Sequence, residues 1–311
     1  MRVRAFAKIN LSLRVLGARA DGYHELRTIF QSIALHDTLT IRAARGPFRL
    51  TCDDAQCPTD DTNLIWRAAE RLWRAAGRRG AARDIAVDIE KRIPLKGGLG
   101  GGSSDAAATL RALGRLWGVD EREVRAAATE LGADVPYFFE GGTVLGLERG
   151  DLLFPLTDWP AAWVVLVIPE FGVSTKDAFE WWDAGASSFD PSTLSGSSRA
   201  ESRDDKLRMS DRRVRPVKGD PLVLSLSKDE LVNDLEAPVA GRHPGIARAV
   251  GALKKAGASH AAMSGSGSAV FGLFLRRTDA ARAAGALASR ARRTIVTRTL
   301  NRSKCQALAA K

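Results

Sequence analysis

Residues 94–110 have the sequence Pro-Leu-Lys-Gly-Gly-Leu-Gly-Gly-Gly-Ser-Ser-Asp-Ala-Ala-Ala-Thr-Leu, in which five of the six residues 97–102 are glycine. Because glycine lacks a Cβ atom, such a loop can adopt positive φ and bring backbone N–H groups close to a ligand. We expect Ser103 or Ser104 to cap the helix that follows, with Asp105 in its first turn. Since unpaired N–H groups at a helix start bind phosphate, the stretch predicts an anion-binding loop.

The loop differs from the common nucleotide-binding signatures. No Gly-Lys-Ser or Gly-Lys-Thr ends it, so the Walker pattern is absent, and its spacing fits the dinucleotide fingerprint only in part. A flexible linker or an ordinary strand-to-helix turn is the alternative. A linker is not normally followed by an amphipathic helix. Here an apolar stripe does follow at helical spacing, made of Ala106, Leu110, Leu113 and Trp117.

The composition limits the class of protein. The chain has 311 residues, enough for two domains, and 45% of them are apolar, as in globular proteins. It has no apolar run of about 18 residues and no signal-peptide pattern, so we expect a cytoplasmic protein without a membrane partner. Cys52, Cys57 and Cys305 show neither pairing nor zinc spacing, so we expect no disulfide framework and no structural metal.

The formal net charge is +11. The arginines and lysines are scattered and often stand beside aspartate or glutamate, instead of forming a stripe with interleaved aromatic residues. We therefore expect most of them to be solvated surface residues and expect no nucleic-acid partner. A positive field would also favour a phosphorylated substrate.

The segment Ala7–Val15 alternates strictly between apolar and polar residues and predicts a half-buried strand. Lys8 and Asn10 then share one face, about 7 Å apart along the strand. We expect that face to border a cleft. A solvent-exposed strand lysine is the alternative interpretation of Lys8.

Three turns carry candidate binding or catalytic residues. An Asp-Gly turn precedes Tyr23, which can stack on a flat ring, and His24, which can hydrogen-bond to the edge of that ring. Asp134 follows the expected end of a helix and precedes an apolar run that would partly exclude water. The Gly/Ser turn at Gly265 and Ser266 offers small side chains and free N–H groups. At each position an ordinary structural turn is the alternative.

We predict two domains, residues 1–160 and residues 161–311. The apolar run 163–168 predicts a strand buried on both faces at the start of the second domain. Ser174 and Thr175 are expected to cap the next helix. Residues 184–228 are rich in Ser, Asp and Arg and are expected to form a mobile insertion.

Taken together, these segments resemble the GHMP kinase superfamily. The resemblance rests on residues 7–11, 19–24, 94–107, 132–136, 173–175, 233–236 and 263–267. It implies an α+β, two-domain GHMP kinase fold with a ribosomal-protein-S5-like N-terminal domain and a ferredoxin-like C-terminal domain. The active site is then expected in the cleft between the two domains.

The resemblance also implies an activity. It points to the superfamily member that uses ATP and Mg²⁺ to phosphorylate the 2-hydroxyl of a methylerythritol linked to cytidine diphosphate, in the non-mevalonate isoprenoid pathway. By resemblance the catalytic pair is Lys8 and Asp134. The expected ATP-binding residues are Lys96, Gly97, Gly98, Leu99, Gly100, Gly101, Gly102, Ser103 and Ser104. The expected substrate-binding residues are Asn10, Tyr23, His24, Thr175, Phe179, Gly265 and Ser266.

The chemistry of these residue types agrees with those roles. A carboxylate such as Asp134 can accept the proton of an attacking hydroxyl, and Lys8 can keep it ionised and attract the γ-phosphate. Tyr23 and Phe179 would sandwich the cytosine while His24 contacts its edge. The sequence does not identify magnesium ligands, and we expect a monomer or a weak homodimer.

Two other functions are compatible with parts of the sequence. One is a different small-molecule kinase of the superfamily, such as a homoserine or mevalonate kinase, although these have no use for a base-stacking Tyr23 beside His24. The other is an RNA-binding protein, given the net charge. Asp151 and Lys176 depart from the pattern expected of the family and leave the substrate side less well defined.

Overall fold

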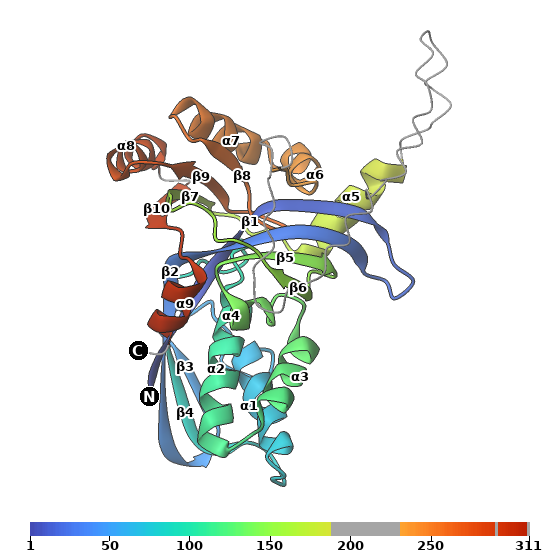
Figure 1. Cartoon of the computed structure of the whole chain (residues 1–311), viewed down its shortest axis with the longest axis vertical. Helices are drawn as coiled ribbons and strands as arrows, with labels where there is room; N and C mark the ends of the chain where they lie inside the picture. Colours follow the sequence, from blue (N-terminus) through green and yellow to red (C-terminus); the bar gives the residue numbers. More distant parts are fainter. Residues whose placement is uncertain (188–230, 290–291, 310–311) are drawn as a thin grey trace.

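The computed structural model describes residues 1–187, 231–289 and 292–309. These residues form two β-sheets, each covered by helices, in an α+β arrangement (Figure 1). The larger sheet and α1–α4 make up the lower part of the view, and the smaller sheet lies above with α6–α8 outside it. This confirms the expected fold class.

The first sheet has the strand order β3-β4-β2-β5-β6, and β1 pairs with β2. Its strands are β1 (Arg2–Ala18), β2 (His24–Pro47), β3 (Arg49–Cys52), β4 (Arg83–Glu90), β5 (Thr143–Glu148) and β6 (Leu152–Pro155). The helices of this half are α1 (Leu64–Ala75), α2 (Gly101–Trp117), α3 (Glu121–Leu131) and α4 (Tyr137–Glu140). Helices α1, α2 and α3 bury their apolar faces against β2 and β4 in one core.

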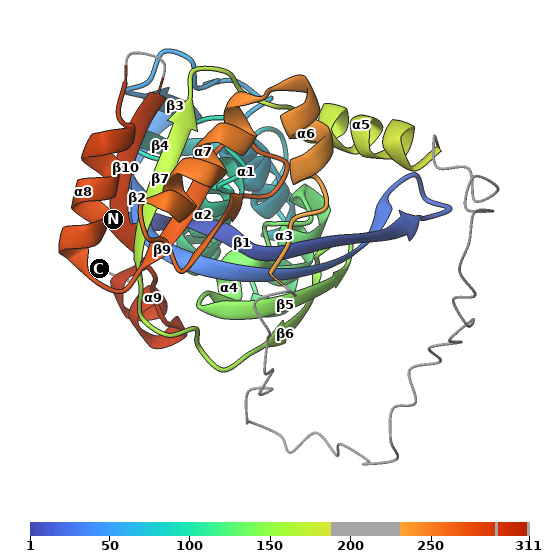
Figure 2. The same ribbon diagram turned by 90° about the horizontal axis from the view of Figure 1, so that it is seen from above.

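The second sheet has the order β10-β7-β9-β8. Its strands are β7 (Trp163–Pro169), β8 (His260–Met263), β9 (Val270–Phe274) and β10 (Arg292–Arg298). The helices of this half are α5 (Thr175–Ser187), α6 (Glu236–Arg242), α7 (Gly245–Lys255), α8 (Arg277–Leu287) and α9 (Arg302–Ala309). Seen from above, α7 and α8 cover this sheet (Figure 2). Strand β7 is central, and its residues 164–167 are fully buried, as the apolar run predicts.

Strand β1 is buried on both faces, so the prediction of a half-buried strand is wrong. Its residues Ala7, Ile9 and Leu11 pack between the two sheets in a shared core. Lys8 is 3% exposed and Asn10 is 2% exposed, which also excludes a solvent-exposed Lys8. The strand is covered on its polar face as well because the glycine loop hydrogen-bonds to it through Leu99.

Alternation along β1 is also interrupted. The pairing of β1 with β2 shifts register between Asn10 and Ser12. Such a bulge rotates the following side chains relative to the preceding ones. As a result Leu13, which strict alternation places on the face opposite Lys8, lines the same cavity as Lys8.

Helix α2 begins earlier than the sequence predicts. Its N-cap is Gly100, in a left-handed conformation and without a side-chain cap. Ser103 and Ser104 lie inside the helix, so the prediction that either one caps it is wrong. Asp105 is likewise beyond the first turn. The glycine at the cap position is what allows the chain to enter the helix without a serine or aspartate cap.

Asp105 instead joins a buried ion network. Lys91 Nζ lies 2.6 Å from Asp37 Oδ2 and 2.7 Å from Asp105 Oδ2, and all three side chains are almost fully buried. Burial alone would lower the pKa of Lys91, but the two carboxylates raise it above its ordinary value. Burial, with the charge of Asp37, raises the pKa of Asp105. Asp37 also accepts hydrogen bonds from the backbone N–H groups of Arg92 and Ile93, so the network anchors the strand end that enters the glycine loop.

Helix α9 packs against β1 and β2 of the first half, where Cys305 contacts Phe6 and Leu300 in a small core.

The division into two domains at residues 160 and 161 stays a prediction. Residues 184–187 of the expected insertion form the end of α5, and the rest of it lies outside the described residues. No helix in the described part of the chain is both long and apolar enough to cross a bilayer.

His260, the first residue of β8, has a ring that is largely buried against Phe271. Burial lowers its pKa to about 4, and the positive charge of Lys254 acts in the same direction, while a backbone hydrogen bond with Leu11 opposes both. Its buried Nε2 has no hydrogen-bond partner among the residues that the structure describes. The imidazole is therefore neutral in the folded protein at neutral pH.

Replacing Lys91 by methionine should destabilise the fold by about 3–5 kcal/mol, because two buried carboxylates would then face each other without a cation. The free energy of unfolding in urea measures this. Arg92→Met is the matched control: its ion pair with Asp53 is about half exposed and screened by solvent, so its loss should change the unfolding free energy far less. Similar losses for both variants would contradict a stabilising role for the network.

Titration of His260 should make the protein sensitive to acid. The unfolded chain takes up the proton below its ordinary pKa of 6.5, whereas the folded protein does so only near pH 4. The contribution is therefore present above pH 6.5 and is lost as the pH falls toward 4, by up to about 3 kcal/mol. His260→Gln should flatten the curve of unfolding free energy against pH in that window. Equal slopes for the variant and the wild type would rule out this source of acid sensitivity.

Candidate active site

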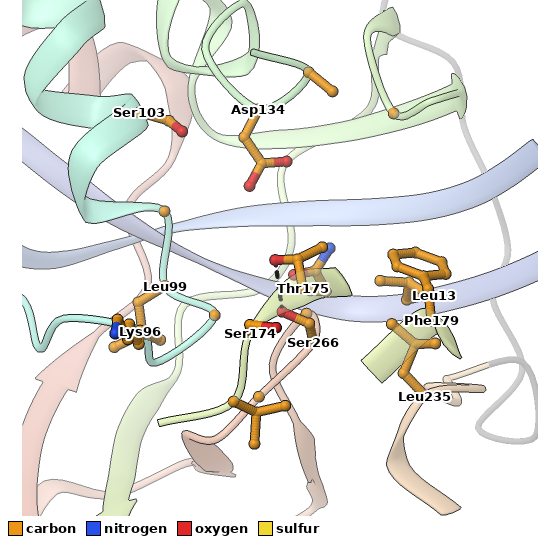
Figure 3. A pocket seen from close by; sticks show the side chains of 18 of the residues that line it. Leu13, Lys96, Leu99, Ser103, Asp134, Ser174, Thr175, Phe179, Leu235 and Ser266 are labelled. Atoms are coloured by element: carbon orange, nitrogen blue, oxygen red, sulfur yellow. Dashed lines mark hydrogen bonds between the residues drawn. The ribbon is translucent and has the colours of Figure 1, made fainter. Parts of the chain in front are cut away.

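A cavity of about 890 Å³ lies where the two halves meet. It brings together nearly all the site residues predicted from the sequence: Lys8, Asn10, Tyr23, His24, Lys96, Gly97, Gly98, Leu99, Gly100, Gly101, Gly102, Ser103, Asp134, Thr175, Phe179, Gly265 and Ser266. Figure 3 shows Ser103 and Asp134 on one side of it, Thr175 and Ser266 on another, and an apolar corner of Leu13, Phe179 and Leu235. Segments far apart in the sequence thus converge on one space.

Ser104 is the exception. Its hydroxyl donates a 2.7 Å hydrogen bond to the carbonyl of Phe6, and its N–H bonds to the carbonyl of Gly100. Ser104 lines a different cavity, together with residues of β1 and α9. Two adjacent serines on a helix point about 100° apart, so only Ser103 can face the glycine loop. The structure therefore does not bring Ser104 to the predicted ATP-binding site.

Lys8 and Asp134 form the charged centre of the cavity. Lys8 Nζ lies 3.3 Å from Asp134 Oδ2, and it donates a 2.7 Å hydrogen bond to Asn10 Oδ1. The Asn10 amide nitrogen in turn donates to the hydroxyl of Thr28, which fixes the orientation of the asparagine. The Lys8 side chain is 4% exposed and that of Asp134 is 35% exposed. The ammonium is thus held in place by its neighbours, while the carboxylate remains accessible to a ligand in the cavity.

The glycine loop is anchored through its carbonyl groups. The carbonyl of Gly97 accepts from Ala269 N–H, that of Gly98 from the Ser264 hydroxyl, and that of Leu99 from Lys8 N–H. Gly98 has φ of +70°, and a Cβ atom there would lie 2.1 Å from the Ser264 carbonyl oxygen. Gly100 has φ of +69°, and a Cβ atom there would lie 2.7 Å from the ring of Phe138. Both positions therefore require glycine.

Because the carbonyls point into the protein, the loop N–H groups are left for a ligand. Among the described residues, none accepts a hydrogen bond from the N–H of Gly98, Leu99 or Gly100. The N–H groups of the first turn of α2, which have no intrahelical partner, continue the same series. This row of free donors at a helix start fits the phosphate groups of a nucleotide such as ATP.

A second glycine turn, between β8 and β9, faces this loop. Asn233 holds it by donating 2.8 Å hydrogen bonds to the carbonyls of Met263 and Gly265. Ser266 then hydrogen-bonds to Thr175 at the start of α5, with 3.1 Å between the two hydroxyl oxygens. The turn and the start of α5 therefore present one hydroxyl group each to the cavity.

Tyr23, His24 and Phe179 form the aromatic end of the cavity. The ring of Phe179 stacks on His24, with 4.5 Å between centroids and an interplanar angle of 19°. Tyr23 is 54% exposed and lies beside the guanidinium of Arg149, 5.1 Å from the ring centroid. One face of Phe179 is thus covered by His24, and the sandwich of a base between Tyr23 and Phe179 stays a prediction.

Asp151 and Lys176, the two residues that depart from the family pattern, lie in different surroundings. Asp151 pairs with Arg149 and so supports the cation beside Tyr23. Lys176 is an exposed residue of α5 that pairs with Glu180 one turn later. Asp151 thus acts on the aromatic end of the cavity, whereas Lys176 forms an ordinary helix-surface pair.

Several lining or supporting residues were not predicted from the sequence. They include Leu13, Thr28, Arg149, Asp183, Asn233, Ser264 and Leu235. Most are single polar or apolar residues without a local signature. Asn233 and Ser264 lie in segments 233–236 and 263–267, on which the family resemblance rests. That resemblance was the sequence signal that could have identified these two residues.

A magnesium ion would depend on few protein ligands. The described residues contain no group of three or more His, Cys, Asp or Glu side chains able to hold a metal. Mg²⁺ in phosphoryl-transfer sites usually needs only one or two carboxylates in addition to phosphate oxygens and water. The phosphate oxygens held by the loop N–H groups would supply most of the ligands of such an ion.

Comparisons with known proteins agree with this geometry. The family model "GHMP kinases N terminal domain" matches residues 63–142, and "GHMP kinases C terminal" matches residues 222–293. A 4-diphosphocytidyl-2-C-methyl-D-erythritol kinase of Moorella thermoacetica is 41% identical over 95% of this chain and 98% of its own length. The protein of the same name from Solibacter usitatus is 43% identical over 90% of this chain and 83% of its own.

The fold is also similar to that of solved kinase structures. A crystal structure of 4-(cytidine 5'-diphospho)-2C-methyl-D-erythritol kinase matches with a TM-score of 0.72 and 32% identity, over 96% of this chain and 99% of the other. Homoserine kinase from Cytophaga hutchinsonii matches at 17% identity with a TM-score of 0.63, over 98% and 96% of the two chains, and shares the fold alone. The chain therefore belongs to the GHMP kinases, in the family of 4-diphosphocytidyl-2-C-methyl-D-erythritol kinases.

Proposed function

We propose that this kinase transfers the γ-phosphoryl group of ATP to the 2-hydroxyl of 4-diphosphocytidyl-2-C-methyl-D-erythritol, a step of the non-mevalonate isoprenoid pathway. The observation that supports this best is that the Lys8–Asp134 pair lies between two binding regions of one cavity. One region is the row of free N–H groups in the glycine loop, and the other is the aromatic end with Tyr23, His24 and Phe179.

The glycine loop would bind the triphosphate of ATP. Phosphoryl transfer needs alignment and neutralisation of charge on the transferring group more than covalent help. Backbone N–H donors held rigidly by three carbonyl anchors provide both without reorganising. Exposed Lys96, at the edge of the same loop, adds positive charge for the nucleotide.

Asp134 would act as the general base. Its accessible carboxylate can accept the proton of the 2-hydroxyl as the oxygen attacks phosphorus. Lys8, 3.3 Å away, orients that carboxylate through their ion pair. The same ammonium can move toward the γ-phosphate and stabilise the charge that develops there. Asn10 limits the positions open to the lysine through its own hydrogen bond.

Mg²⁺ bound with ATP would be held chiefly by phosphate oxygens and water, and it would supply further neutralisation of the phosphate charge. Other residues that line the cavity would hold the rest of the substrate. Gly265, Ser266 and Thr175 face the loop and are placed to contact the diphosphate or the methylerythritol hydroxyls. His24 and Phe179 would form one wall of the nucleobase subsite, and the exposed ring of Tyr23 would form the other.

Homoserine and mevalonate kinases share this fold at 12–17% identity. Neither substrate contains a nucleobase, so the aromatic end of the cavity has no use in those reactions. Its presence favours the cytidine-linked substrate. We further propose that the enzyme acts in the cytoplasm, where ATP is available, as a monomer or weak homodimer.

The reaction is tested by ATP consumption with purified protein and 4-diphosphocytidyl-2-C-methyl-D-erythritol as acceptor. Methylerythritol 4-phosphate, homoserine and mevalonate serve as acceptors without the nucleotide. We expect turnover with the cytidine-linked acceptor at a kcat/KM at least about 10³-fold above the others, because remote binding energy raises the specificity constant. Equal or faster turnover of an acceptor without the nucleotide would overturn the proposal.

Asp134→Asn should lower kcat by about 10²- to 10⁴-fold, the usual loss when a general base is removed. ATP affinity, measured by calorimetry, should change by less than about threefold, since the loop N–H groups are untouched. Asp61→Asn is the control, because Asp61 is exposed and lies outside the cavity. Retained turnover in the Asp134 variant would exclude the base role.

A further inference from the structure

Thr28 of β2 is hydrogen-bonded to Asn10, the residue that holds the Lys8 ammonium. The Thr28 side-chain oxygen accepts a 2.8 Å hydrogen bond from Asn10 Nδ2 and donates a 2.8 Å hydrogen bond to the carbonyl of Ser12. Thr28 is 1% exposed and Asn10 is 2% exposed. Asn10 Oδ1 accepts the hydrogen bond of Lys8 Nζ. A chain of hydrogen bonds therefore connects the lysine to the backbone of β1 through one threonine.

The direction of each hydrogen bond in this chain follows from its chemistry. A carbonyl oxygen can only accept, so the single proton of the Thr28 hydroxyl is donated to Ser12. The Thr28 oxygen can then only accept, and the group of Asn10 that faces it must be the amide NH2. The amide oxygen of Asn10 is left facing Lys8, whose ammonium has donors and no acceptor. The Thr28 hydroxyl thus determines which end of the Asn10 amide faces the lysine.

Removal of that hydroxyl would release the amide. Among the described residues, no group other than Thr28 accepts a hydrogen bond from Asn10 Nδ2. The last torsion of an asparagine side chain is broad and roughly two-fold, so the amide can turn over. Gly265 limits other movements, because a Cβ atom there would lie 3.3 Å from Asn10 Oδ1 and 3.3 Å from Lys8 Nζ. A turned amide would place its NH2 group against the ammonium, so that two donors face each other.

We propose that Thr28 is a positioning residue for phosphoryl transfer. By fixing the Asn10 amide, it holds the Lys8 ammonium between Asn10 and Asp134, from where the ammonium can contact the γ-phosphate. Without the Asn10 acceptor, Lys8 would shift toward Asp134, the other polar partner of its ammonium among the described residues. The inference rests on the proposed function, since it concerns the Lys8–Asp134 pair.

A positioning role predicts a loss of turnover without a loss of binding. The triphosphate is expected on the loop N–H groups, which Thr28 does not contact through a hydrogen bond. A displacement of about 1 Å at a reacting centre can lower the rate by about 10²-fold. Thr28 also lines the cavity, so a direct contact with the substrate is the competing role. Loss of such a contact would raise KM instead.

The test measures kcat and both KM values for the wild type, Thr28→Val and Thr28→Ser, with ATP and 4-diphosphocytidyl-2-C-methyl-D-erythritol. Valine replaces the hydroxyl by a methyl group of similar size. Serine keeps the hydroxyl and lacks the methyl group that lies against Gly146. In Thr28→Val we expect kcat to fall by about 10- to 100-fold, with both KM values within about threefold. In Thr28→Ser we expect kcat within about threefold of the wild type, because the hydroxyl is restored.

A double-mutant cycle with Asn10→Ala tests whether Thr28 acts through Asn10. Once Asn10 is alanine, no amide remains for the Thr28 hydroxyl to orient. Thr28→Val should then lower kcat by less than about twofold, because residues of one hydrogen-bond network are not additive. A full 10-fold or larger loss in that background would show that Thr28 acts by another route and would contradict the inference.

Thr109→Val is the matched control. Thr109 is fully buried in α2, donates a 2.8 Å hydrogen bond to the carbonyl of Asp105 and does not line the cavity. The loss of its hydroxyl should leave kcat and both KM values unchanged. Circular dichroism and ATP affinity by calorimetry check that each variant is folded. Thr28→Cys, whose thiol is only a weak hydrogen-bonding group, serves if the valine variant does not fold.

Two outcomes with an active wild type would overturn the inference alone. One is an unchanged kcat in a folded Thr28→Val or Thr28→Cys variant, and the other is a loss that appears only in KM. A wild type that does not phosphorylate the cytidine-linked substrate would overturn the proposed function, and the inference with it.

Discussion

Burial of strand β1 on both faces is the constraint on which the rest of the molecule depends. On one face Ala7, Ile9 and Leu11 form the core shared by the two sheets. On the other, Lys8 and Asn10 lie beneath the glycine loop. A buried lysine requires a compensating charge and hydrogen bonds, because its desolvation is otherwise costly. Asp134 and Asn10 provide these, so the contact that makes the fold possible also assembles the charged centre of the active site.

The glycine loop acquires its function from its attachments. Its three carbonyl anchors come from β1 and from the turn between β8 and β9, which belong to opposite halves of the protein. With the carbonyls engaged, the N–H groups face the cavity. Below the loop, the Asp37–Lys91–Asp105 network ties the end of β4 to the first turns of α2. Loop, strand and helix therefore form one rigid support, and rigid donors stabilise charge at little reorganisation cost.

Much of this could be predicted from the sequence, because the signals were local. The glycine loop, the strand 163–168 and the turn at Asp134 have composition or periodicity that few other structures share. The errors have specific causes. A left-handed Gly100 replaced the expected serine cap, which moved the helix start and turned Ser104 away from the site. A bulge in β1 brought Leu13 to the face that alternation assigns to Lys8. The contact of Asp183 with His24 has no local signature, since the two residues are 159 positions apart in the chain.

The sequence by itself determined the parts: an anion-binding loop, a strand with a lysine and an asparagine on one side, an aromatic–histidine pair, an aspartate in a turn, and the family that combines them. Backbone propensity, glycine content and short-range periodicity are enough to specify such elements. Only the tertiary structure decided which groups meet and which of the two adjacent serines, Ser103 or Ser104, faces the cavity. Those outcomes depend on the packing of β1 between two sheets and of α5 beside the β1–β2 hairpin, and contacts over such separations leave no local trace in the chain.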